Sequence, residues 1–151
     1  MQDPTVADGW RSQLRKNFLS LLSLLVALSA LSYNTWRNES TERNRNIRAA
    51  EFEMLRHLIE VQQIIDRSAH PAGSDLNTGL NRVLLIHDLA QLTPPPVTQA
   101  AEQLRSTWVS QSEALAQYAS KPEAAKAASD HLSEQVWQTR QSVLASLRSL
   151  H

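Results

Sequence analysis

The sequence contains no cysteine, which excludes disulfide bonds, thiolate metal sites and cysteine nucleophiles. Glycine is scarce as well, and three scattered glycines (Gly9, Gly73 and Gly79) cannot form a phosphate-binding loop. The chain of 151 residues has no net charge, because 15 basic residues balance 15 acidic ones, and this argues against a nucleic-acid-binding protein. The abundant residues are Ala, Leu, Gln, Glu and Arg, a composition that favours helices throughout.

Catalytic and metal-binding patterns are missing too. None of the many serines lies in a glycine-rich elbow beside a suitable base. Glu53, His57 and Glu60 share one helical face, but metal-binding four-helix bundles use Glu-x-x-His elements, which this chain lacks. We expect this face to point away from the apolar stripe that contains Met54 and Val61, and interpret it as surface ion pairs. The sequence therefore predicts no enzyme, no catalytic residue, no metal ligand and no cofactor.

One run, Phe18 to Trp36, has no charged side chain and reads FLSLLSLLVALSALSYNTW. As a helix it extends roughly 28 Å, close to the thickness of a bilayer's hydrocarbon core. A helix satisfies its own backbone hydrogen bonds, as lipid requires of an isolated segment. We therefore predict a transmembrane helix over residues 14–36, preceded by a disordered tail over residues 1–13.

A cleaved signal peptide is the alternative interpretation of this run. Its charged region would be Arg15 and Lys16, its apolar region Phe18–Leu28, and its cleavage site the small-residue segment Ala30–Ser32. The 17-residue polar lead and the unbroken helical character through Thr35 favour the anchor instead.

Small or polar side chains recur along one side of the predicted span, at steps of three and four residues. Such a stripe lets a second helix approach closely, so the predicted partner is a second copy of the chain or another membrane protein. Serines can instead bond back to their own turn, and a leucine–serine composition readily produces this pattern. The predicted helix–helix contact residues in the membrane are Ser20, Ser23, Ala27, Ala30 and Asn34.

Aromatic and basic residues gather at the end of the span and in the juxtamembrane connector, residues 37–48. Within the connector the helix either continues or breaks near Ser40 and Thr41. Residues 1–48 carry seven basic and four acidic side chains, which suits anionic lipid headgroups. Three basic residues precede the span and four follow it, so orientation is undecided, with a slight preference for a cytoplasmic domain. The predicted headgroup contacts are Tyr33, Trp36, Arg37, Arg43, Arg45 and Arg48.

Beyond the connector, the apolar residues follow a helical period, and the prolines lie at the boundaries between helices. The predicted helices cover about residues 43–68, 75–92, 96–119 and 122–149. Ser74 or Asp75 is expected to cap the second helix, and Ser120 with Glu123 to form a capping box before the last one. The predicted fold is all-α, an N-terminal transmembrane helix that continues into an up-down antiparallel four-helix bundle over residues 43–151.

Each predicted helix has an apolar face that we assign to the core. The first carries Ile47, Met54, Leu58, Val61 and Ile65, widened by Phe52, Leu55, Ile59 and Ile64. The second carries Leu80, Val83, Leu84, His87 and Ala90, and the third Val97, Ala101, Leu104, Trp108, Leu115 and Tyr118. The last carries Ala125, Ala128, Leu132, Val136, Val143 and Leu147, and we interpret Trp108 and Trp137 as core anchors. Any apolar stripe left uncovered would be a partner site.

The string Tyr-Asn-Thr-Trp-Arg-Asn-Glu at residues 33–39, with Arg43 and Asn44 downstream, resembles a group of small uncharacterised bacterial single-pass membrane proteins. In this group an apolar N-terminal run precedes the same string, and the resemblance covers roughly residues 14–66. It implies a membrane anchor and a bacterial origin, and it implies no activity.

Together these features predict a membrane-anchored, non-catalytic helical interaction module that works by helix–helix contact, as a scaffold, an accessory subunit or a signal-input domain. The predicted location is the bacterial inner (plasma) membrane, with the lipid bilayer as a partner. The alternative is a tethered bundle that senses a small molecule or a metal, and its sign would be a closed pocket lined by His87 or His131.

Overall fold

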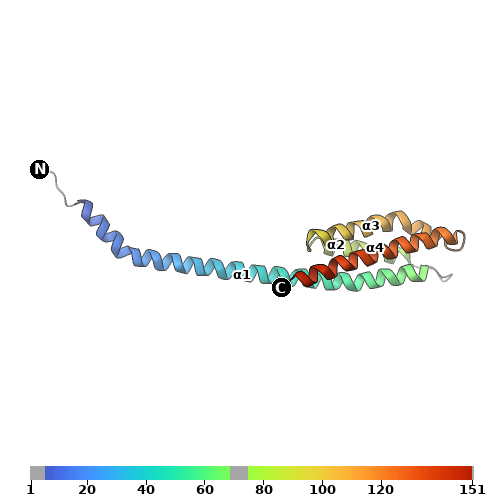
Figure 1. Cartoon of the computed structure of the whole chain (residues 1–151), viewed down its shortest axis with the longest axis horizontal. Helices are drawn as coiled ribbons and strands as arrows, with labels where there is room; N and C mark the ends of the chain where they lie inside the picture. Colours follow the sequence, from blue (N-terminus) through green and yellow to red (C-terminus); the bar gives the residue numbers. More distant parts are fainter. Residues whose placement is uncertain (1–5, 69–74, 151) are drawn as a thin grey trace. The chain divides into compact units, whose positions relative to one another are not determined.

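The computed structural model describes residues 6–68 and 75–150, and these residues form four α-helices and no strand. The helices are α1 (Val6–Ser68), α2 (Leu76–Ala90), α3 (Pro95–Ala116) and α4 (Pro122–Ser149), as Figure 1 shows. The predicted all-α class is confirmed. The predicted turn from Ala69 to Gly73 lies outside the described residues, as do residues 1–5 of the predicted tail.

Helix α1 begins earlier than the sequence predicts and does not break in the connector. Residues 6–13, predicted as a tail, are helical, and so are residues 37–48. The hydroxyl of Thr41 donates to the carbonyl of Arg37, 2.9 Å away, so this side chain stays within the helix and caps no new one. No proline occurs between Pro4 and Pro71, so nothing in this stretch removes a backbone donor and stops the helix.

The chain divides into two compact units, residues 1–43 and 44–151. In the first unit, every described side chain from Lys16 to Arg43 is exposed. This part of α1 contains one segment that is long and apolar enough to span a membrane. The predicted core lies entirely in the second unit.

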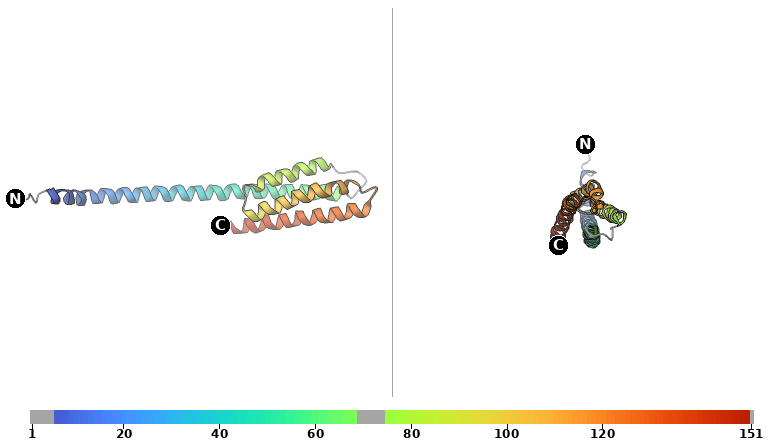
Figure 2. Two further views of the ribbon diagram at one scale, coloured as in Figure 1. Left: turned by 90° about the horizontal axis from the view of Figure 1, so that it is seen from above. Right: turned by 90° about the vertical axis from the view of Figure 1, so that its right-hand side faces the viewer.

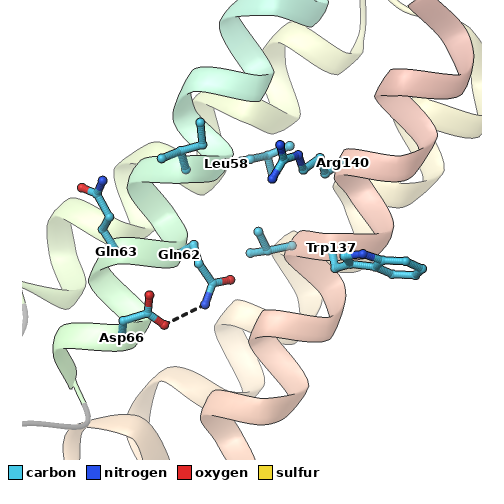
Figure 3. A pocket seen from close by; sticks show the side chains of 8 residues that line it. Leu58, Gln62, Gln63, Asp66, Trp137 and Arg140 are labelled. Carbon is cyan, nitrogen blue, oxygen red and sulfur yellow. Dashed lines mark hydrogen bonds between the residues drawn. The ribbon is translucent and has the colours of Figure 1, made fainter. Parts of the chain in front are cut away.

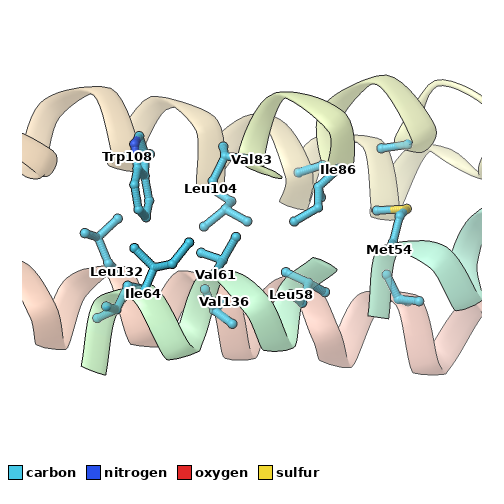
Figure 4. Close-up of a cluster of buried hydrophobic side chains, with 14 of the residues drawn as sticks. Met54, Leu58, Val61, Ile64, Val83, Ile86, Leu104, Trp108, Leu132 and Val136 are labelled. Carbon is cyan, nitrogen blue, oxygen red and sulfur yellow. The ribbon is translucent and has the colours of Figure 1, made fainter. Parts of the chain in front are cut away.

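In the second unit, the C-terminal part of α1 packs with α2, α3 and α4 as an antiparallel bundle (Figures 1 and 2). One apolar cluster fills its interior, with Trp108 as the largest fully buried side chain (Figure 4). Polar contacts join the same helices: Gln62 Nε2 donates to Ser133 Oγ at 2.9 Å between α1 and α4, and Thr139 Oγ1 to the Ala100 carbonyl at 3.2 Å between α4 and α3. The predicted core residues that are buried include Met54, Leu58, Val61, Ile65, Val83, Ala90, Val97, Leu104, Leu115, Leu132 and Val143.

The predicted inward faces are wrong at several positions. On α2 the buried residues are Gly79, Val83, Ile86 and Ala90, whereas Leu84 is exposed. The reason is that Trp108 packs against Gly79, and this contact turns the Gly79 side of α2 toward the core. Tyr118 is exposed because it follows the end of α3. On α1, Phe52 and Ile59 are exposed because no neighbouring helix covers them.

The predicted caps have different outcomes. Asp75 caps α2 as expected, and its carboxylate accepts a hydrogen bond from the Thr78 backbone at 3.1 Å. The capping box at Ser120 is wrong, because the N-cap of α4 is Lys121. Ser120 takes part in the preceding turn, where its backbone N–H donates to the Gln117 carbonyl at 3.0 Å. Helix α3 accordingly ends at Ala116, three residues before the predicted end at Ala119.

Candidate interaction surfaces

The stripe of small residues in the span is exposed along its whole length. Ser20, Ala27, Ala30 and Asn34 have no covering side chain in the first unit, and Ser23 is exposed as well. Ser23 Oγ donates to the Leu19 carbonyl at 2.8 Å, so its hydroxyl is satisfied within its own turn. The stripe therefore presents small side chains, whose main contribution to the packing of a second helix is close approach.

The predicted headgroup residues are also exposed, with one difference. The rings of Tyr33 and Trp36 lie one turn apart with centroids 6.3 Å from each other, and both face outward. Arg37, Arg43 and Arg45 are exposed. Arg48, however, donates a hydrogen bond to the Leu150 carbonyl at the end of α4, where a cation also suits the helix dipole. Arg48 therefore caps the C-terminal end of α4 within the bundle.

A groove of about 340 Å³ lies on the outer side of the bundle between α1 and α4 (Figure 3). Leu58 and Val136 are buried beneath it, while Ile59 is 50% exposed and Trp137 is 56% exposed. The ring of Trp137 extends outward from α4 (Figure 3). From the sequence, Ile59 was assigned to the core and Trp137 was interpreted as a core anchor. Both lie instead on an exposed surface that the sequence did not reveal. The groove is lined by Leu58, Ile59, Gln62, Gln63, Asp66, Val136, Trp137 and Arg140.

The apolar side chains around this groove repeat at seven residues on both helices. On α1, Phe52 is 63% exposed and precedes Ile59 by seven residues; on α4, the half-buried Leu144 follows Trp137 by seven. We call Phe52, Ile59, Trp137 and Leu144, together with the groove, the α1–α4 face. A seven-residue apolar repeat is the pattern with which helices pack side by side.

His57 lies in a charged network between α1 and α2, not on the surface face that the sequence predicts. It is 1% exposed, and its Nε2 and Nδ1 atoms each lie 3.2 Å from a carboxylate, that of Glu53 and that of Glu60. Glu60 also pairs with Arg82 Nε of α2 at 2.7 Å. The prediction failed because α2 covers this side of α1. The hydrogen bond with His57, and after it the charge of Arg82, lowers the pKa of Glu60 below its usual value.

The other histidines take different positions. His87 Nε2 lies 3.0 Å from a carboxylate oxygen of Glu102, which joins α2 to α3. A hydrogen bond from Arg105, strengthened by the charges of Arg105 and His87, holds the pKa of Glu102 below its usual value. His131 is exposed.

A second hollow of about 300 Å³ at the α3–α4 turn is lined by Leu115, Tyr118, Pro122, Glu123, Ala125, Lys126 and Ser129. Neither this hollow nor the groove includes a histidine.

A buried acid, Glu51, is a further residue that sequence reasoning missed. Its side chain is 0% exposed, on the buried side of α1 with Ile47 and Met54. Its spacing of four residues from Ile47 and three from Met54 places it within the apolar stripe, and this was the available signal. Among residues 16–68 and 75–150, no group of three acidic or histidine side chains is placed to hold a metal ion.

No family model matches the chain, and no curated protein or solved structure matches it either. The exposed faces of the two units are therefore the features from which a function can be inferred.

Proposed function

We propose that this protein is a membrane-anchored, non-catalytic interaction module that works by helix–helix contact. The observation that carries the proposal is the uncovered α1–α4 face, in a chain whose first helix contains a segment able to span a membrane. Large side chains such as Phe52 and Trp137 are more than half exposed on this face. Contiguous apolar surface of this kind marks an interaction site on a soluble domain.

The occupant that we infer for this face is a second copy of the chain. Anchoring in one bilayer concentrates two copies and favours a second contact once the first has formed. The groove carries one charge of each sign, Asp66 and Arg140, and two amides, Gln62 and Gln63, so two identical faces meet without a uniform repulsion. The stripe of small residues in the span gives the same pair of chains a contact within the membrane.

The location that we propose is the bacterial inner membrane, with Tyr33, Trp36 and the arginines after them at the lipid headgroups. The string at residues 33–39 supports this location through its resemblance to bacterial single-pass proteins. We place the bundle on the cytoplasmic side, because the arginines that follow the span favour that side. Protease treatment of intact spheroplasts tests this: a cytoplasmic bundle stays intact, whereas a periplasmic one is digested.

Site-directed crosslinking of the full chain in membranes tests the proposed contact. The chain has no native cysteine, so each introduced thiol is the only one present. We expect a Gln63→Cys variant, at the edge of the groove, to form a crosslinked dimer under mild oxidation. A Ser106→Cys variant, which is exposed on α3, serves as the matched control and remains monomeric. A strict monomer in both variants, or equal crosslinking of both, contradicts the proposal.

The alternative function, a small-molecule or metal sensor, has weaker support. The hollow at the α3–α4 turn offers Glu123 and Lys126 at its edge, but it contains no histidine and is open to solvent. A rise in the melting temperature of the full chain with a panel of divalent metals or metabolites would favour this alternative.

A further inference from the structure

Glu51 is an acid sealed inside the bundle without a partner. Its side chain is 0% exposed, and neither carboxylate oxygen has a hydrogen-bond partner among the described residues. The hydroxyl of Ser146 on α4 faces this carboxyl, and it too is buried and makes no hydrogen bond of normal geometry. An ionised carboxylate in such surroundings is costly, whereas a neutral carboxylic acid can be buried at a much smaller cost.

The charged groups around this acid do not compensate it. On α1, Arg48 lies one turn before Glu51, but its guanidinium bonds to the Leu150 carbonyl. Glu53 pairs with Arg56 and His57. On α4, Arg148 is exposed, and the turn between α2 and α3, residues 91–94, has no titratable side chain. Burial raises the pKa of Glu51, and the Ser146 hydroxyl opposes that rise only in part.

We propose that Glu51 is a proton-binding site that controls how tightly the start of the bundle on α1 packs against the end of α4. In the packed form the carboxyl is neutral and faces the Ser146 hydroxyl. Loss of the proton leaves a charge that the packed form cannot solvate, so the end of α4 moves away from α1 and water reaches the carboxylate. Acidic conditions therefore close this end of the bundle, and alkaline conditions open it.

The direction of this pH response follows from the linkage between proton binding and folding. A group whose pKa is raised on folding contributes its full stability at pH values below the pKa of the unfolded state, here 4.5. That contribution disappears as the pH rises through the pKa of the folded state. The opening is local because the apolar cluster farther along the bundle, from Leu58 to Trp108, contains no comparable acid. The proposal is independent of dimer formation, because both helices belong to one chain.

Spin-label distance measurements on the full chain in nanodiscs test this inference. One pair of labels replaces the exposed residues Ala49 and Ala145, which report on the end of the bundle that contains Glu51. A second pair replaces Ala116 and Ala127, both exposed near the α3–α4 turn, as the distant control. Each pair is measured between pH 4 and 9 in the wild type and in Glu51→Gln. Glu113→Gln, at an exposed acid on α3, is the matched control variant.

We expect the first pair to shift to longer, broader distances as the pH rises above 4.5 in the wild type and in Glu113→Gln. In Glu51→Gln the short distances persist throughout, and the second pair is constant in all variants. Ser146→Ala moves the transition to higher pH, because the hydroxyl favours the charged form. Circular dichroism verifies folding, and Glu51→Leu replaces Glu51→Gln if the latter does not fold. An unchanged wild type, or a transition that survives in both Glu51 variants, overturns the proposal.

Discussion

Trp108 on α3 occupies the space that a side chain at Gly79 on α2 would need. A methyl group built at Gly79 overlaps the six-membered ring of the indole and also lies 3.3 Å from Ile64 Cγ2 of α1. The glycine is therefore required by close packing, at the point where three helices meet around the largest buried side chain.

We predict that Gly79→Ala destabilises the bundle, although alanine is the better helix former. Overpacking of a filled core costs about 1–3 kcal/mol, more than the roughly 1 kcal/mol that alanine gains in helix propensity. Chemical denaturation followed by circular dichroism measures the difference. Asn81→Ala, at an exposed position on the same helix, is the control and changes stability by less than about 0.5 kcal/mol.

The overlap itself is tested by a second substitution. Trp108→Phe removes the part of the ring that meets Gly79, so the double variant Gly79→Ala, Trp108→Phe is expected to be more stable than the sum of the two single changes. Strict additivity would contradict the proposed clash.

The two tryptophans of the bundle are expected to behave differently on truncation. Trp108 is 1% exposed, so Trp108→Ala removes a core anchor and costs about 3–5 kcal/mol of folding stability. Trp137 is 56% exposed on the α1–α4 face, so Trp137→Ala changes the stability of the monomer by only about 0.5 kcal/mol. It should nevertheless abolish the Gln63→Cys crosslink. A large loss of monomer stability in Trp137→Ala would instead assign this residue to the core.

The sequence predicts the core of the bundle where a helix is covered on the expected side. Met54, Leu58, Val61 and Ile65 follow the helical period of α1, and all four are buried. Phe52 and Ile59 follow the same helical period, but they lie about a third of a turn round the helix from this stripe and are exposed. Periodicity describes one helix at a time, whereas exposure depends on which sides the other three helices leave open.

The polar interior was missed for a related reason. Glu51 and His57 are residues that prefer solvent, and hydropathy therefore counts them as surface positions. Their burial follows from their neighbours. Helix α4 covers Glu51. Helix α2 covers His57, whose ring lies between the carboxylates of Glu53 and Glu60, and Glu60 pairs in turn with Arg82. Val83 and Ala90 were placed correctly on the buried face of α2, but the Gly79 side was missed because Gly79 carries no apolar side chain, although it receives the Trp108 ring.

The ion pairs between α1 and α2 predict a loss of stability in acid. The pKa of Glu60 is lowered by its hydrogen bond with His57 and by the charge of Arg82. A lowered folded pKa contributes stability above the unfolded value of 4.5, and this contribution disappears as the pH falls through the folded pKa. We therefore expect the melting temperature to fall below pH 4.5, and to fall less in Glu60→Gln.

This response is opposite in sign to that of Glu51, and the two are separable. Glu60→Gln lowers the melting temperature at pH 7 but leaves the Ala49–Ala145 label distances unaffected. Exposure of the Glu60 side chain, 33%, keeps the effect modest because solvent screens the pair. An acid response that is identical in Glu60→Gln and the wild type would show that other carboxylates cause it.

The stripe in the span is expected to contribute to association through close approach alone. Ala27→Leu adds bulk at the middle of the stripe without adding polarity, so it separates two packed helices and weakens dimer formation in the membrane. Ser29→Leu, an exposed small residue on the other side of the helix, is the matched control and leaves association unchanged. Energy transfer between labelled full-length chains in liposomes gives the dimer fraction for each variant. Equal dimer fractions in Ala27→Leu and Ser29→Leu would confine the contact to the α1–α4 face, because lipid then covers the stripe in both the monomer and the dimer.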